Sequence, residues 1–261
     1  MRKWRGTGYY RLMEFDHLVI NVRNGMDEAA QAFEQLGFIV TPPSLHSLGS
    51  LNRTIVFDTS YIELLGYPPG CPPAARPELV QRPTGPLALV FRTSDADATH
   101  RDLTAAGFKP RPVQTFSRPV RDDAGVDIAA VFRVTRLEPD ALPGAWVYFC
   151  QHLTPELIWR PQWRAHANAA VSIMAIDVRV DQVVSAADDY ARATRAAGTS
   201  SASKLRLAEG CELRFVSSVI TGIAGIQIAT AMADSLVREA RIAGLSVGFL
   251  PMAQSHAWPS E

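Results

Sequence analysis

One order of strands and a helix recurs along this chain, and this recurrence constrains the fold more than any other feature. Residues 15–22, FDHLVINV, are rich in branched side chains, as a half-buried strand is. A helical pattern follows over 26–36, with Gly37 at the position where a helix commonly ends. Apolar runs at 52–57 and 60–67 then predict two further strands. The predicted unit is therefore a strand, a helix and then more strands.

The same order restarts three times. A second copy begins at 87–93 and a third at 172–180, although the third lacks residues between its helix and its final hairpin. A fourth begins at 223–230, with a helix predicted over 233–244 and a strand over 245–251, and we expect it to be truncated. Repetition at this period indicates a supersecondary unit that buries its face against copies of itself. We predict an α+β protein of about four tandem modules; the alternative is a ferredoxin-like α+β fold whose stretches resemble one another by chance.

Composition and charge favour a protein that handles small molecules. Of the 261 residues, 47% are hydrophobic, which is enough to fill a sizeable core. The 26 basic and 26 acidic residues cancel without long runs of either sign, so neither nucleic acid nor a membrane surface is an expected partner. No run reaches the roughly 20 apolar residues of a membrane span, and the basic start lacks a signal peptide's apolar run. The three cysteines are widely and irregularly spaced, so we expect them to be reduced and the protein to be cytoplasmic.

Three segments follow from this pattern. Residues 1–12 are expected to form an N-terminal arm, 13–160 the paired first and second modules, and 161–261 the degenerate third and fourth modules. The proline-rich stretch 67–86 is expected to be a rigid linker. The polar and aromatic stretch 154–170 is expected to line the site. A truncated fourth module would leave an edge for a partner, so a homodimer is a further expectation.

Motifs of the first module resemble the glyoxalase-like domain family of the vicinal-oxygen-chelate superfamily. They are DHLVINV, the helix ending in LGF, the H-x-x-G-x-x-N run from His46 to Asn52, and YIELLG. The stretch FCQHLTPELIWRPQWRAHANAA, residues 149–170, is similar to the family's central region. The resemblance spans about residues 14–250. It implies βαβββ modules whose curled mixed sheets form half-open barrels, with a divalent metal in the cavity.

The resemblance places metal ligands on the first and last strands of a module, where this chain carries His17 and Glu63. An imidazole and a carboxylate are costly to bury unpaired, and a divalent cation satisfies both. Leu87 stands where the second module would supply another histidine, so His152 on that module's last strand is the third predicted ligand. The predicted ion is Zn, Ni, Mn or Fe. The alternative is a metal-free pocket in which these side chains bond to each other or to backbone.

Other candidate residues surround this pair. Glu63 is the predicted base, and His46, in a loop with Gly49 that could fold over the pocket, is the second predicted catalytic residue. The predicted substrate-binding residues come from the following strand and from the stretch 154–170: Asn52, Arg53, Trp159, His166 and Asn168. The alternative for the later ones is a structural role, in which tryptophans bury their rings and fasten the linker.

The leading functional hypothesis is a metal-assisted isomerase or lyase of glyoxalase-like type. It would act on a small oxygenated substrate by moving a proton next to a metal-bound oxygen. One alternative is an extradiol-type Fe(II) dioxygenase that uses His17, His152 and Glu63 as a two-histidine, one-carboxylate triad. The other is a protein that binds and sequesters a small molecule without turnover, which the degenerate second module favours.

Overall fold

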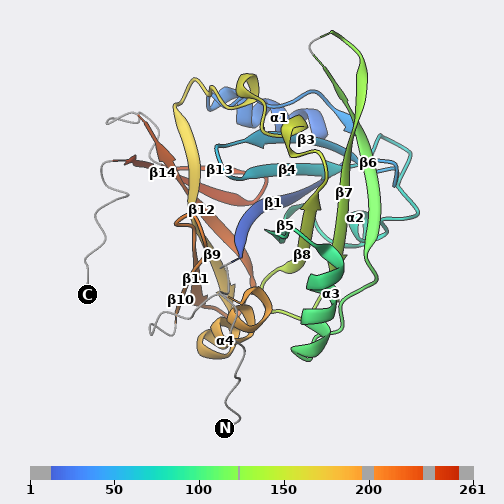
Figure 1. Cartoon of the computed structure of the whole chain (residues 1–261). Coiled ribbons are helices and arrows are strands. Elements are labelled where there is room, and N and C mark those ends of the chain that lie inside the picture. Colours follow the sequence, from blue (N-terminus) through green and yellow to red (C-terminus); the bar gives the residue numbers. More distant parts are fainter. Residues whose placement is uncertain (1–12, 123, 196–202, 232–238, 253–261) are drawn as a thin grey trace.

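The computed structural model of the chain describes residues 13–122, 124–195, 203–231 and 239–252. Two mixed sheets, here called sheet A and sheet B, make up the architecture, with helices packed on their outer faces (Figure 1). Strands of the first two modules build sheet A: β1 (Glu14–Arg23), β2 (Ser44–Leu45), β3 (Leu51–Val56), β4 (Tyr61–Gly66), β5 (Gly85–Arg92), β6 (Gln114–Arg121), β7 (Asp127–Arg136) and β8 (Trp146–His152).

Sheet A curls into a nearly closed barrel. Its strand order is β2-β3-β4-β1-β5-β8-β7-β6, with β1 and β5 antiparallel at its centre and each parallel to the last strand of its own module. The two outer strands, β2 and β6, approach each other, as two hydrogen bonds show. The amide of Ser47 donates to the carbonyl of Ser117 at 2.8 Å, and the Ser44 hydroxyl donates to the carbonyl of Pro119 at 2.6 Å. The predicted α+β class and βαβββ modules are confirmed.

Each of the first two modules has one crossover helix. These are α1 (Met26–Gln35) and α3 (Ala96–Ala105). Gly37 and Gly107 follow them with φ of 84° and 88°, a left-handed conformation that suits glycine after a helix. The proline-rich stretch also contains a short helix, α2 (Glu78–Gln81), which Pro77 precedes. Proline is tolerated at that position because a first-turn N–H has no partner within the helix.

Sheet B repeats the pairing of sheet A in a smaller form. It contains β9 (Ala170–Val180), β10 (Lys204–Arg206), β11 (Glu212–Ser217), β12 (Gly222–Thr230), β13 (Glu239–Ile242) and β14 (Leu245–Pro251), and α4 (Val183–Thr194) lies between β9 and β10. The order is β10-β11-β9-β12-β14-β13, with β9 antiparallel to β12 as β1 is to β5. The recurrence seen in the sequence therefore corresponds to a repeated strand arrangement.

The helix predicted over 233–244 is wrong at its end, since Glu239–Ile242 is strand β13 and pairs with β14. Ala243 and Gly244 have φ of 47° and 80°, and two successive positive φ values are typical of the two-residue turn that joins a hairpin. Turn geometry and strand pairing outweigh the helical spacing there. The rest of this predicted helix and the N-terminal arm lie outside the described residues.

The hydrophobic core is continuous between the two sheets. One buried cluster contains Phe33 and Phe149 from the first two modules together with Ile176 and Phe249 from sheet B. The ring of Phe38, just after α1, stacks on Phe249 with centroids 5.8 Å apart. A second cluster fills much of the inside of the barrel and leaves the space described below.

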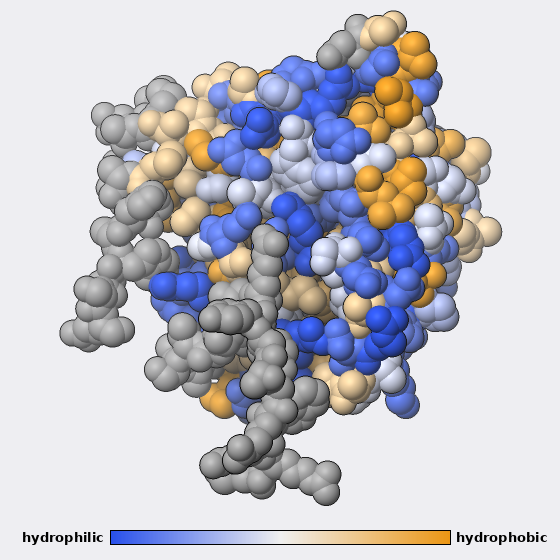
Figure 2. All heavy atoms as spheres, in the orientation of Figure 1, coloured by the Kyte–Doolittle hydropathy of each residue, from blue (hydrophilic) through white to orange (hydrophobic). Residues whose placement is uncertain are grey.

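Hydrophilic and hydrophobic residues are interspersed on the visible face, with a hydrophobic cluster over the projecting β6–β7 hairpin (Figure 2). Val126 and Ile128 of that hairpin are exposed. Among the described residues, none of the helices has the length and apolar character needed to span a bilayer.

Candidate functional site

A cavity inside the barrel of sheet A, here called the barrel cavity, gathers the polar side chains of both modules. It holds about 460 Å³ of space not filled by protein atoms, part of it open to solvent. The residues around it are His17, His46, Asn52, Tyr61, Glu63, Arg76, Val90, Phe116, Arg118, Phe132, Val134, Arg136, Tyr148 and Cys150. Four predicted site residues, His17, His46, Asn52 and Glu63, are thus brought together.

Glu63, on β4, is the central carboxylate of this group. Nε2 of His17 lies 3.8 Å from its Oε2, and Nε2 of His46 lies 3.8 Å from its Oε1. Asn52, on the neighbouring strand β3, donates its amide to Oε1 at 3.0 Å. Burial raises the pKa of Glu63, but His17, His46 and the Asn52 hydrogen bond outweigh it and bring the pKa below its ordinary value. Glu63 is therefore ionised at neutral pH.

His17 is held in one orientation from two sides. Its Nδ1 lies 2.7 Å from Oδ2 of Asp16, and its ring stacks on Tyr61 with centroids 4.2 Å apart and planes at 15°. Neighbouring residues of a regular strand face opposite sides, but the β1–β5 ladder skips Asp16: Phe15 pairs with Phe91 and His17 with Val90. Such a bulge redirects a side chain. Asp16 can therefore reach the ring of the adjacent histidine.

His46 is buried, although the sequence places it in a loop. It follows β2, and Gly49 turns the chain with φ of 83°, so that the His46 amide bonds to the carbonyl of Ser50 at 2.8 Å. Its Nδ1 lies 2.9 Å from the Ser50 hydroxyl, which leaves Nε2 toward Glu63. Burial lowers the pKa of His46 to about 3, only partly opposed by Glu63. Its imidazole is neutral at physiological pH.

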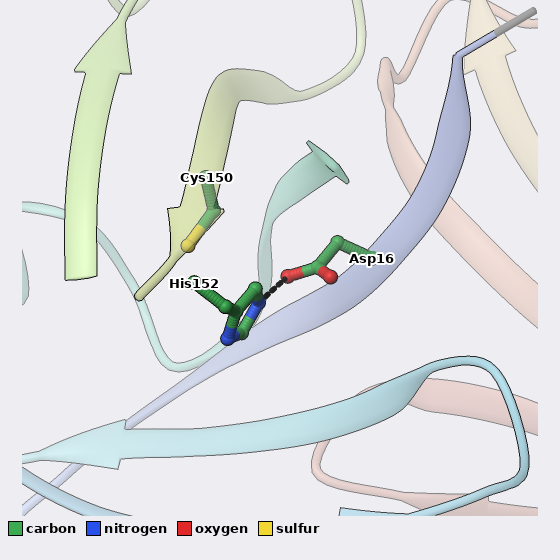
Figure 3. A group of neighbouring side chains, drawn as sticks. All are labelled: Asp16, Cys150 and His152. Carbon is green, nitrogen blue, oxygen red and sulfur yellow. Dashed lines mark hydrogen bonds and ion pairs between the residues drawn. The ribbon is translucent and has the colours of Figure 1, made fainter. Parts of the chain in front are cut away.

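Asp16 contacts both His17 and His152. Figure 3 shows its contact with His152. Nε2 of His152, at the end of β8, lies 2.8 Å from the same Oδ2, and Arg92 donates to Oδ1 at 2.8 Å. Burial would raise the pKa of this fully buried carboxyl, but His152 and His17 hold it well below its usual range.

Asp16, Cys150 and His152 also offer ligand atoms that all lie within 4.8 Å of one another. Burial raises the pKa of the Cys150 thiol, so this group offers a thiol rather than a thiolate.

His152, the third predicted metal ligand, faces Asp16 rather than Glu63. It lines an open groove next to the barrel, together with Arg92 and Trp159. Trp159 lies under the Arg92 guanidinium at 4.3 Å and packs edge-on against His152 at 5.0 Å. The predicted substrate-binding Trp159 is thus beside the site, in the groove and not in the barrel cavity.

Arg53, predicted to bind substrate, does not line the barrel cavity. It follows Asn52 on β3, so strand alternation turns it to the opposite face. Its guanidinium donates to the carbonyl of Thr41 at 2.8 Å and pairs with Glu34 of α1 at 3.3 Å. These contacts hold α1 against the sheet.

His166 and Asn168, also predicted to bind substrate, fasten the chain between the modules. They follow two 3₁₀ turns, Pro155–Leu157 and Pro161–Trp163. Nδ1 of His166 accepts from the amide of Ile39 at 3.0 Å, and its Nε2 lies 3.0 Å from the carbonyl of Val56.

Asn168 donates to the carbonyl of Leu36 at 2.9 Å and accepts from the amide of Ala170 at 3.1 Å. Both side chains are thus occupied by backbone groups.

Three arginines that were not predicted from the sequence also line the barrel cavity: Arg76, Arg118 and Arg136. Arg136 is two residues from Val134 on β7, and strand alternation puts both on the inner face. On β6, Arg118 is likewise two residues from Phe116, so both side chains point to the inner face. Polar residues in phase with inward apolar ones were therefore a usable signal. Arg76 lies in the proline-rich stretch, which has no such periodicity.

Comparison with known proteins agrees with this architecture. The glyoxalase-like domain model matches residues 15–194. A hypothetical protein from Staphylococcus aureus has a similar structure, with a TM-score of 0.73, 14% identity, and coverage of 92% of this chain and 100% of that one. A mutant of 4-hydroxymandelate synthase from Streptomyces coelicolor gives a TM-score of 0.53 at 12% identity, covering 85% of this chain and 72% of the other.

Methylmalonyl-CoA epimerase from the same organism is 22% identical over 54% of this chain and 99% of its own, with a TM-score of 0.41. No curated protein matches the sequence. At these identities the structural likenesses concern the fold, whereas the family match covers more than half of the chain. The chain belongs to the glyoxalase-like domain family.

Proposed function

We propose that the barrel cavity is the active site of an enzyme that moves a proton on a small oxygenated substrate, with Glu63 as the base. One observation carries this proposal: a buried, ionised carboxylate has the Nε2 atoms of His17 and His46 on either side at 3.8 Å. An isomerase or lyase reaction needs such a base next to a carbonyl or enolate oxygen.

The chain's own residues divide the work of proton transfer. Asn52 donates to Oε1 of Glu63 and so orients the carboxylate that accepts the substrate proton. His46 is neutral because burial lowers its pKa, so one ring nitrogen can donate while the other accepts. It is suited to return a proton to the substrate or to donate a hydrogen bond to its oxygen. Apolar side chains such as Val90 and Phe132 limit water in the same cavity.

The donors around Glu63 fit a divalent metal in their chemistry. Metal-binding histidines commonly give their second nitrogen to a carboxylate or another polar group, and Nδ1 of His17 and of His46 are held in this way by Asp16 and Ser50. His17 and Glu63 would hold the ion, with His46 on the other side of the carboxylate. A bound Zn, Ni, Mn or Fe ion would polarise a substrate carbonyl and stabilise the enolate that proton removal creates.

The Fe(II) dioxygenase alternative ranks lower than proton transfer. It requires His152 and Glu63 at one ion, whereas Nε2 of His152 is bonded to Asp16.

Exchange of substrate hydrogen with solvent tests the proposal. The metal-loaded chain would be incubated in D₂O with small 2-oxo acids, hydroxyketones and thioesters, and proton NMR would follow deuterium entry next to the carbonyl. We expect exchange with at least one compound, slowed on the order of 10²- to 10⁴-fold in Glu63→Gln. Glu138→Gln, which removes a mostly exposed carboxylate, is the control. Equal exchange in Glu63→Gln and the native chain would refute the role of Glu63.

A further inference from the structure

Three buried guanidinium groups converge on the barrel cavity from three different parts of sheet A and its connections. Arg76 precedes α2, Arg118 lies on β6 and Arg136 lies on β7, and their exposed fractions are 5%, 8% and 7%. Arginine is seldom buried to this degree unless it is paired.

These arginines are only partly compensated by the protein. Nε of Arg76 pairs with Glu78, but its buried Nη2 has no hydrogen-bond partner. Arg136 donates Nη1 to the neutral amide of Gln114 at 2.9 Å, and its buried Nε has none. In the part of the chain that the structure describes, the Arg118 guanidinium has no hydrogen-bond or ion-pair partner.

The surroundings of Arg136 in the wall of the barrel cavity also suit a bound anion. Arg136 lies over the ring of Tyr148, 5.1 Å from its centroid, and the buried hydroxyl of Tyr148 has no partner either. Unpaired buried charge and unpaired buried donors are both destabilising, so a fold retains them when something else satisfies them. Guanidinium N–H groups match the two oxygens of a carboxylate, or those of a phosphate, in a bidentate fork.

We propose that Arg118, Arg136 and Tyr148 form a carboxylate-binding subsite, with Arg76 adding positive charge, and that the substrate is a small carboxylic acid. The subsite and Glu63 line the same cavity, so a carboxylate held by the arginines would keep the reacting carbon near the base. This inference rests on the proposed function for its chemistry, whereas binding of the anion does not depend on turnover.

The test measures binding by the full-length chain with calorimetry and thermal unfolding. The probes are pyruvate and malonate as carboxylates, inorganic phosphate as the other oxyanion, and pyruvamide as the neutral counterpart. We expect the carboxylates to bind and to raise the unfolding temperature, with phosphate and pyruvamide at least tenfold weaker. Arg118→Met and Arg136→Met should each weaken carboxylate binding at least tenfold. Arg121→Met is the matched control, because Arg121 lies on the same strand as Arg118 with a side chain that is 73% exposed.

Stability without ligand separates a binding role from a structural one. Arg118→Met removes an unpaired buried charge, so the ligand-free variant should unfold at a higher temperature than the native chain. A lower unfolding temperature with unchanged carboxylate affinity would overturn the proposal. Arg118→Lys keeps the charge without the fork and should also bind carboxylates more weakly, which keeps the test decisive if a methionine variant does not fold.

Two further outcomes would also overturn the assignment: tighter binding of phosphate than of any carboxylate, and no response to any anion. Glu63→Gln separates this inference from the proposed reaction. It should keep carboxylate binding even if deuterium exchange shows that Glu63 is not the base.

Discussion

Oδ2 of Asp16 lies 2.7 Å from Nδ1 of His17, and this contact fixes which ring nitrogen faces the barrel cavity. Since Nδ1 is occupied, Nε2 is the atom that faces Glu63 at 3.8 Å. The pair forms because the β1–β5 ladder skips Asp16, which lets its carboxylate reach the neighbouring ring. The orientation of the central histidine is thus set by one bulge residue.

Asp16→Asn should weaken metal binding without preventing folding. An amide oxygen can still accept one hydrogen bond, but it cannot stabilise both histidine contacts as a carboxylate does. We expect the affinity for Zn²⁺ or Mn²⁺, measured by calorimetry, to fall about 10- to 100-fold, as for other partners of metal-binding histidines. Asp177→Asn, a substitution in β9 of sheet B, is the control. Equal affinities in both variants and the native chain would argue against the Asp16 role.

The metal-free chain should lose stability as the pH falls below about 6.5. The pKa of His46 is lowered in the folded state to about 3, so the stability linked to its neutral form is present above the unfolded value and is lost as the pH falls toward 3. The slope linked to this one proton is at most about 1.4 kcal/mol per pH unit. The free energy of unfolding, measured with urea between pH 7 and 4, should depend less steeply on pH in His46→Asn than in the native chain. His100→Asn, the control, should show the pH dependence of the native chain.

His166→Ala should affect stability but not the barrel cavity. The substitution leaves the amide of Ile39 and the carbonyl of Val56 without their present partner. We expect the free energy of unfolding to fall by about 1–3 kcal/mol, with carboxylate binding and metal content unchanged. Loss of binding at native stability would instead place this residue at the site.

Thiol labelling should distinguish the three cysteines. Cys71 is exposed, whereas Cys150 and Cys211 are buried. Burial raises the pKa of Cys211 to about 12 and that of Cys150 well above its ordinary value, so neither forms the reactive thiolate at pH 8. One thiol per native chain should react quickly with Ellman's reagent and the others only in denaturant. Fast labelling at Cys150 in native protein, located by mass spectrometry, would show that the barrel opens.

Much of the fold follows from local patterns. Strand alternation and glycines such as Gly37 and Gly107 mark the elements of the first two modules, because those signals depend on neighbouring residues alone. The fourth module was harder, since the Ala243–Gly244 turn and its partner strand decide the conformation of 239–242. Pairing between distant strands competes there with helical spacing.

The site was only partly predictable for a similar reason. His17 and Glu63 stand on polar positions of apolar strands, which local sequence reveals. The bond from His152 to Asp16 joins residues 136 positions apart and depends on a bulge, so spacing could not indicate it. Arg118 and Arg136 reach the barrel cavity only once β6 and β7 close the barrel.

Elemental analysis of the purified chain and its variants measures whether His17 and Glu63 hold a metal ion. We predict about one Zn, Ni, Mn or Fe per native chain, loss of the metal in His17→Ala and in Glu63→Ala, and retention in His166→Ala. A metal content unchanged by His17→Ala and Glu63→Ala, or a metal-free native chain that still binds carboxylates equally well in both variants, would contradict it.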